Sequence, residues 1–288
     1  MKRYLYMPDA THSYDAEVVK VTTFPDGETS IMIPVGSMRD DEITLIGSCH
    51  SAQASESFLA AAYEIAAQGP KSFTVFNTYF RHARSERSTD GCAALAKFQA
   101  RQWSGLGRVY PGVRLDFVEL HKDTVLHYFE GAVVTNNRTC RELLETYIPY
   151  LNDETVFATV DEGGVYEAKK LAQKAGVGFA HIEKKRLSGS ETKVLKVLGD
   201  DVAGKKVIIF DDMIATGGSA CAAAQAYRER GATSVVLAAT HGIFAGDAIS
   251  ALSQNYLIDT VFVTDSHPNA ELAEDSNPTL IKVIPLNW

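Results

Sequence analysis

Short, mostly apolar runs recur along the chain with helix-like stretches between them, and this alternation constrains the fold more than any other feature. Strands that are covered by helices on both faces read as near-continuous apolar runs, and such strands are typical of parallel sheets. The runs lie at 42–47, 72–77, 114–120, 155–160, 178–183, 206–210, 234–239 and 259–264. The pattern therefore predicts an α/β fold with mostly parallel sheets.

The stretches between the runs have the composition of helices. Two clear examples are "SESFLAAAYEIAAQ" at 55–68 and "GGVYEAKKLAQKAG" at 163–176, and Gly176 is expected to end the second in a left-handed conformation. The number of strands is too large for one ordinary sheet, so we expect two halves, each a sheet flanked by helices. We place the division between residues 1–140 and 141–288.

Composition excludes several classes of protein. A formal net charge of -8 argues against a non-specific nucleic-acid binder, which requires a basic face. The four cysteines have no paired spacing, which argues against a disulfide framework or a zinc site and favours a reducing compartment. No apolar run reaches membrane-spanning length, and the N-terminus lacks a signal peptide's apolar core, so we expect no membrane partner and a cytoplasmic location.

Polar residues follow several of the predicted strands at their carboxyl ends, where ligands bind in folds of this kind. Asp211 and Asp212 are expected to end the strand at 206–210, and Lys184 and Arg186 to follow the strand at 178–183. The other residues in such positions are Asp161, Glu119, His121 and the segment 77–87.

The stretch "VIIFDDMIATGGS" at 207–219 contains an apolar strand, two acids and a small-residue turn in direct succession. Gly217 and Gly218 let the backbone approach an anion, and Thr216 and Ser219 add hydroxyl groups at the start of a helix. That half of the stretch suits a phosphate monoester.

The two acids in the same stretch suit a different group. Asp211 and Asp212 cannot bind phosphate, but they can accept hydrogen bonds from two neighbouring hydroxyls. A phosphate loop beside a diol acceptor predicts a site for a ribose 5-phosphate unit.

The stretch resembles the phosphoribosyl-pyrophosphate-binding loop of the type I phosphoribosyltransferase superfamily. Further segments occur in the order seen in ribose-phosphate pyrophosphokinases, so the chain is similar to that family over nearly its whole length. These segments are "FPDGE" (24–28), "YFRHARSER" (79–87), "ELHKDTVLHYFEG" (119–131), "DEGGVYEAKKLA" (161–172), "EKKR" (183–186) and "ATHGIFAGDAI" (239–249). The resemblance implies two tandem phosphoribosyltransferase-like halves.

The resemblance also implies a reaction, the transfer of the β,γ-pyrophosphoryl group of ATP to the anomeric hydroxyl of ribose 5-phosphate. Lys184 and Arg186 match the family's catalytic cations on a closing flap, "KKRLSGSETK". His121 and Asp161 match ligands of Mg²⁺, and His121 also matches a contact to the triphosphate of ATP. A polyanion needs such cations in order to move past another anion.

For the nucleotide, Phe24, Asp26 and Glu28 match an adenine-binding loop that family members lend to a neighbouring subunit. The resemblance therefore implies self-association into at least a dimer. From the residues alone, the same loop is as well interpreted as an exposed hairpin end. Arg84 and Ser85 fall at positions that contact ATP in the family.

The chain departs from the family at two of these positions. Ser85 replaces a longer amide, and Ala215 stands where the kinases commonly carry aspartate. A less negative and less crowded loop could admit a bulkier 5′ group, such as the diphosphate of ADP-ribose. The acceptor could therefore be ribose 5-phosphate or ADP-ribose.

Two further hypotheses remain. One is a catalytically silent regulatory homologue, against which the presence of Lys184, Arg186, His121 and Asp161 argues. The other is a phosphoribosyltransferase, which would not need the "FPDGE" loop.

Overall fold

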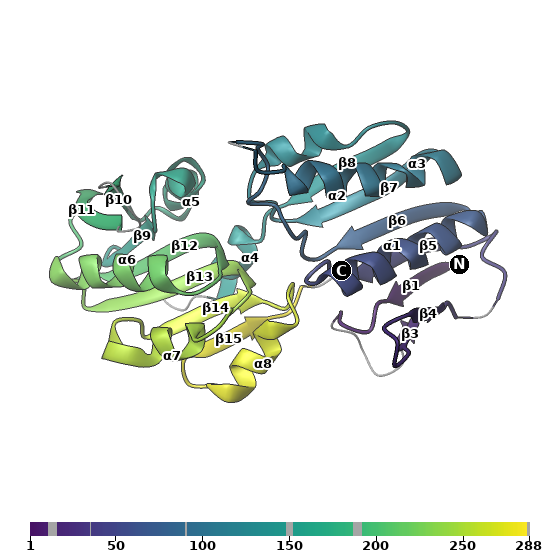
Figure 1. Cartoon of the computed structure of the whole chain (residues 1–288). Coiled ribbons are helices and arrows are strands. Elements are labelled where there is room, and N and C mark those ends of the chain that lie inside the picture. Colours follow the sequence, from purple (N-terminus) through teal and green to yellow (C-terminus); the bar gives the residue numbers. More distant parts are fainter. Residues whose placement is uncertain (11–15, 35, 90, 148–151, 187–191, 287–288) are drawn as a thin grey trace. The chain divides into compact units, whose positions relative to one another are not determined.

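The chain forms two compact units in the computed structural model (Figure 1). The structure describes residues 1–10, 16–34, 36–89, 91–147, 152–186 and 192–286. Unit 1 comprises Met1–Thr139 together with Ser266–Pro268, and unit 2 comprises Cys140–Asp265 and the segment that begins at Asn269.

Unit 1 contains a six-stranded sheet in the order β2–β1–β5–β6–β7–β8, with every neighbouring pair parallel. Its strands are β1 (Lys2–Tyr6), β2 (Glu17–Val18), β5 (Glu42–Gly47), β6 (Ser72–Asn77), β7 (Val113–Val118) and β8 (Val133–Arg138). A separate antiparallel hairpin joins β3 (Lys20–Thr23) to β4 (Thr29–Met32).

The helices of unit 1 pack on this sheet through one hydrophobic core. They are α1 (Ala52–Ala67), α2 (Leu95–Ser104), α3 (Leu106–Val109) and a 3-10 helix, Asp123–Tyr128. Ser51 caps α1 by accepting a hydrogen bond from the backbone N–H of Ala54 at 3.0 Å. Phe58 of α1 and Trp103 of α2 meet edge to face, with ring centroids 5.0 Å apart.

The short segment Ser266–Pro268 also belongs to unit 1. Thr78 Oγ1 donates a hydrogen bond to the backbone oxygen of Ser266 at 2.8 Å. The ring of His267 lies edge-on to that of Tyr79, with centroids 4.9 Å apart. This packing holds the segment against the end of β6.

Unit 2 contains a seven-stranded sheet in the order β11–β10–β9–β12–β13–β14–β15. All neighbouring pairs are parallel except β10 with β11. Its strands are β9 (Thr155–Thr159), β10 (Gly178–Arg186), β11 (Thr192–Gly199), β12 (Lys206–Ile214), β13 (Ser234–Gly242), β14 (Thr260–Thr264) and β15 (Ile281–Ile284).

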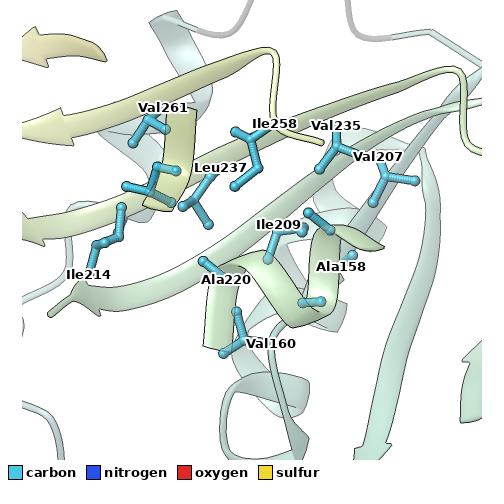
Figure 2. Close-up of a cluster of buried hydrophobic side chains, with 14 of the residues drawn as sticks. Ala158, Val160, Val207, Ile209, Ile214, Ala220, Val235, Leu237, Ile258 and Val261 are labelled. Carbon is cyan, nitrogen blue, oxygen red and sulfur yellow. The ribbon is translucent and has the colours of Figure 1, made fainter. Parts of the chain in front are cut away.

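Helices cover both faces of this sheet, through two separate cores. On one face lie α6 (Gly218–Glu229), α7 (Ala248–Ser253) and α8 (Asn269–Ser276); on the other lie α4 (Arg141–Tyr147) and α5 (Val165–Ala175). Figure 2 shows side chains from β12, β13, β14 and α6 pointing toward one another in the first core. Short 3-10 helices occupy Glu162–Gly164 and Gln254–Tyr256.

The expected fold class is confirmed: parallel sheets are flanked by helices, and the strands expected at 42–47 and 72–77 have those bounds. Gly176 ends α5 in the left-handed region, at φ 70°. None of the helices in the described residues is long and apolar enough to cross a membrane.

Two expectations about strand ends are wrong. Asp211 and Asp212 do not end their strand, because β13 continues to Gly242 and offers pairing partners as far as Ile214. Lys184 and Arg186 do not follow their strand but lie within β10, because antiparallel pairing with β11 extends it.

Candidate active site

Three acidic side chains lie near one another where β9 ends at Thr159 and its neighbour β12 continues past it to Ile214. The two strands are parallel neighbours, with Phe210 beside Thr159, so Asp161 lies near Asp211. The backbone N–H of Asp212 donates to Asp211 Oδ1 at 2.9 Å. Tyr227 of α6 donates its hydroxyl proton to the backbone oxygen of Thr159 at 3.0 Å, which anchors this end of β9.

The environment of Asp211 opposes its negative charge. Burial raises the pKa of Asp211 well above its usual range, and the charges of Asp212 and Asp161 raise it further. Hydroxyl donors or a cation placed here would relieve that repulsion. Acids perturbed in this way at the edge of a parallel sheet are typical of a ligand site.

The phosphate loop predicted from the sequence connects β12 to α6. Gly217 has a φ of +80°, and a Cβ at this position would lie 3.3 Å from Leu252 Cγ. Both facts favour glycine there. A neighbouring segment fixes the start of the loop: the backbone oxygen of Ala215 accepts a hydrogen bond from the N–H of Ala245 at 2.9 Å.

The end of this loop is open to solvent. Thr216, Gly218 and Ser219 are exposed, and they surround the first turn of a 12-residue helix. Free backbone N–H groups at such a turn attract a phosphate group. The two halves of the predicted ribose 5-phosphate site are thus adjacent along β12 and its loop.

The predicted catalytic cations lie on a two-stranded ribbon. β9 pairs with β10 only at Gly178–Ala180, whereas β11 pairs with β10 as far as Arg186. The pairing shifts register between Glu183 and Lys184. The side chains of Lys184 and Arg186, and residues 187–191 of the predicted flap, lie outside the described part of the chain.

In unit 1, the turn that carries Arg84 follows β6. Arg84 is exposed, whereas Ser85 is engaged with the segment before α2. The hydroxyl of Ser85 donates to the backbone oxygen of Ala93 at 3.2 Å, and its backbone oxygen accepts from the N–H of Ala96 at 3.1 Å. Sequence reasoning missed this structural use of Ser85.

The next residue has a buried carboxylate that pairs with a partly exposed lysine, and no sequence pattern indicates this contact. Glu86 is 6% exposed, and its Oε1 lies 2.7 Å from Lys122 Nζ. The hydrogen bond and charge of Lys122 hold the pKa of Glu86 below its usual range, and the charge of nearby His121 lowers it further. Half-buried His121 directly precedes Lys122 and lies just beyond the end of β7.

The "FPDGE" loop forms the tip of the β3–β4 hairpin. The N–H of Phe24 donates to the backbone oxygen of Glu28 at 2.8 Å, and the N–H of Glu28 donates to Asp26 Oδ1 at 3.1 Å. The side chain of Phe24 is 48% exposed. An aromatic ring left open on a hydrogen-bonded tip is available to a ligand or a second chain.

Within the described residues, no group of three or more histidine, cysteine, aspartate or glutamate side chains could hold a metal ion. Mg²⁺ does not require such a group, because it keeps several waters and binds through one or two carboxylates together with substrate phosphates. The oxygen donors of Asp161 fit this chemistry better than the imidazole of His121.

Comparison with known proteins shows which fold the chain shares. Residues 134–265 match the family described as "Phosphoribosyl transferase domain". A crystal structure of phosphoribosylpyrophosphate synthetase from Mycobacterium smegmatis superposes with a TM-score of 0.81 at 27% identity, covering 98% of this chain and 94% of that one. The fold is therefore that of enzymes built on phosphoribosyltransferase-like sheets.

Curated relatives identify the family. The chain is 31% identical over 268 residues to ribose-phosphate pyrophosphokinase of Thermococcus kodakarensis, covering 92% of this chain and 91% of the relative. It is 30% identical over 275 residues to the Thermotoga maritima enzyme of the same name, covering 92% and 82%. The chain belongs to the ribose-phosphate pyrophosphokinase family and is an enzyme.

Proposed function

We propose that the protein transfers the β,γ-pyrophosphoryl group of ATP to the anomeric hydroxyl of ribose 5-phosphate. One observation carries the proposal: Asp211 and Asp212 of β12 come shortly before a glycine loop and a helix start, which suits a ribose diol and its 5′-phosphate. The anomeric oxygen forms a bond to the β-phosphorus and its proton is released to water, while the bond from that phosphorus to the α–β bridging oxygen breaks and AMP leaves. The products are phosphoribosyl pyrophosphate and AMP.

Residues of unit 2 bind and orient the acceptor in this proposal. Asp211 and Asp212 accept hydrogen bonds from the 2- and 3-hydroxyls, and this removes part of the repulsion that raises the pKa of Asp211. The 5′-phosphate lies against the backbone of Gly217 and Gly218 and the hydroxyls of Thr216 and Ser219. Orienting the acceptor in this way lowers the entropic part of the barrier.

Lys184 and Arg186, on the β10–β11 ribbon, stabilise the negative charge on the transferring group in this proposal. A preorganised cation contributes most where charge develops in the transition state. A two-stranded ribbon paired to the sheet only at its base is a suitable carrier for such groups.

Magnesium supplies further neutralisation of the phosphates when it is bound. Asp161 would hold it through carboxylate oxygen, and His121 would contact it or the triphosphate of ATP. The charge of Asp161 already opposes that of Asp211, so a divalent cation at this edge is electrostatically favoured.

For the nucleotide, we propose that Arg84 contacts the triphosphate and that the hairpin tip of Phe24, Asp26 and Glu28 binds adenine in the site of a second copy. The exposed ring of Phe24 supports this role. The smallest active species is then a dimer.

ADP-ribose is the second candidate acceptor. The methyl side chain of Ala215 is partly exposed, and the backbone oxygen of this residue accepts a hydrogen bond from the N–H of Ala245. The methyl group adds neither bulk nor charge beside the 5′ position. Transfer to ADP-ribose would use the same ribose-binding acids.

The direct test is to incubate the protein with Mg²⁺, ATP and each acceptor in turn and to measure AMP. Release of AMP with ribose 5-phosphate supports the proposal, and release with ADP-ribose alone supports the second candidate. If neither acceptor gives AMP while ATP still binds, the chain is a silent regulatory homologue and the proposal fails.

A further inference from the structure

An ion pair between a buried carboxylate and a partly exposed lysine joins the turn that carries Arg84 to the loop that carries His121. Glu86 Oε1 accepts a hydrogen bond from Lys122 Nζ at 2.7 Å, across 36 positions of sequence. The Glu86 side chain is 8% exposed and that of Lys122 is 46% exposed. Glu86 lies two residues after Arg84, and Lys122 directly follows His121, so the pair spans both segments.

Glu86 is fixed through its backbone as well. The hydroxyl of Tyr128 donates to the backbone oxygen of Glu86 at 2.6 Å, and Lys97 Nζ of α2 lies 5.7 Å from the centre of the Tyr128 ring. In the same 3-10 helix as Tyr128, Val125 is fully buried in the unit 1 core. The Arg84 turn is thereby connected to the core.

The loop of His121 has its own anchors. The N–H of Leu120 donates to Asn137 Oδ1 at 2.9 Å, and Asn137 Nδ2 donates to Asp123 Oδ1 at 2.7 Å. Glu119, at the start of the loop, adopts a φ of +41° and is 8% exposed. A non-glycine residue in that region indicates a backbone that its surroundings hold in place.

We propose that Glu86 and Lys122 are positioning residues that set the separation of Arg84 and His121 for the triphosphate of ATP. This inference rests on the proposed function, in which both of those side chains contact the nucleotide. The carboxylate of Glu86 is buried, and Lys122 is its short-range partner at 2.7 Å. Without Lys122 the carboxylate keeps the more distant Arg87 nearby, whose Nε lies 3.9 Å from the same Oε1 on a side chain that is 74% exposed. Breaking the short bond therefore leaves a buried charge poorly compensated. Neither Glu86 nor Lys122 itself touches the nucleotide in this inference.

The chain contains a matched control on the same unit. Arg101 Nη2 and Glu130 Oε1 lie 3.3 Å apart, but their side chains are 57% and 63% exposed. An exposed pair of this kind contributes little to the geometry around it. Removing its charge should therefore leave nucleotide binding unchanged.

The experiment measures binding of a non-hydrolysable ATP analogue with Mg²⁺ by calorimetry in Glu86→Gln, Lys122→Met and Glu130→Gln. We expect the first two to bind the analogue roughly tenfold or more weakly, because a charge-assisted hydrogen bond to a phosphate weakens steeply when its donor is misplaced. We expect Glu130→Gln, and the affinity of every variant for ribose 5-phosphate, to stay within about twofold of the unchanged chain.

A conservative variant separates positioning from folding. Lys122→Arg keeps the positive charge and the hydrogen bond, so it should restore most of the analogue affinity that Lys122→Met loses. Circular dichroism and thermal unfolding identify any variant that fails to fold. If Lys122→Met or Glu86→Gln fails to fold, the analogue affinity of Lys122→Arg tests the inference instead.

Two results overturn the inference. The first is that Glu86→Gln and Lys122→Met bind the analogue as tightly as Glu130→Gln does. The second is that Lys122→Arg loses as much analogue affinity as Lys122→Met. Either result would show that the pair does not position the nucleotide contacts. A chain with its original sequence that neither binds the analogue nor releases AMP contradicts the proposed function itself, and the inference with it.

Discussion

Replacing Asp211 by asparagine should stabilise the protein at neutral pH. Burial, and then the charges of Asp212 and Asp161, raise the pKa of Asp211 above its ordinary value of 3.8, so the folded state opposes its ionisation. Well below pH 3.8 the carboxyl is protonated in both the folded and the unfolded chain. As the pH rises, the unfolded chain loses the proton first, and the folded state loses stability until the folded pKa is passed. The neutral amide of an asparagine side chain carries no such cost.

The size of the effect follows from the shift. Each tenfold weakening of the acid in the folded state corresponds to about 1.4 kcal/mol of unfolding free energy at a pH above both pKa values. Each kcal/mol moves the melting temperature by roughly 2–4 °C for a domain of this size. The backbone bond from the N–H of Asp212 to Oδ1 survives in asparagine, so little is lost in exchange.

The assay is thermal unfolding of the original chain and Asp211→Asn at pH 4 and pH 7.5, without Mg²⁺ or substrate. Asp153→Asn, which neutralises an exposed acid of the same unit, is the control. The Asp211 variant should melt several degrees higher at pH 7.5 and show a much smaller gain at pH 4. Its affinity for ribose 5-phosphate should fall, because an acceptor site for the diol is weakened. If Asp211→Asn does not raise the melting temperature at pH 7.5, or raises it equally at both pH values, this account of the site is refuted.

Four other changes test the remaining parts of the site. Lys184→Ala should lower turnover roughly 10²–10³-fold while binding of an ATP analogue changes little; near-normal turnover would contradict its role. Mixing Phe24→Ala with Lys184→Ala subunits should restore some activity, because some mixed sites contain neither change; a fully active monomer at high dilution would disprove the shared site. Ala215→Asp should depress the kcat/KM for ADP-ribose far more than that for ribose 5-phosphate if ADP-ribose is the natural acceptor, and an unchanged ratio would show that the loop does not read the 5′ group. Gly217→Ala should destabilise the loop by about 1 kcal/mol or more, measured by urea unfolding, because φ is +80° there.

The sequence predicts the strongly apolar strands well and the first strand of the chain poorly. β5 and β6 lie inside a parallel sheet, so most of their residues are apolar. β1 alternates between buried and exposed residues, and its buried Arg3 is satisfied by Glu17 at 2.6 Å. Because a charged residue occupies a buried position, this strand has no long apolar run that could be recognised in the sequence. The partner that makes the burial possible lies 14 positions away.

In the candidate site too, features that follow from strand position could be predicted, and features that depend on tertiary contacts could not. The rule that ligands bind at the carboxyl ends of parallel strands selects Asp161 and Asp211 from sequence, and the structure places them close enough to interact. The contact of Glu86 with Lys122 could not be predicted, because no pattern links residues that meet only through tertiary packing. Ser85 was missed for the same reason: its partners, Ala93 and Ala96, lie across a turn.

The assignment of Ser266–Pro268 to unit 1 has a consequence for protein engineering. The polypeptide passes between the units after Thr139, again after Asp265 and once more after Pro268, so no single cut yields both units complete. A fragment that ends at Thr139 would leave Thr78 without the backbone oxygen of Ser266 and Tyr79 without its ring partner. Gene fusions, split reporters and crystallisation fragments of this enzyme are therefore better designed around loops within a unit than around the sequence midpoint.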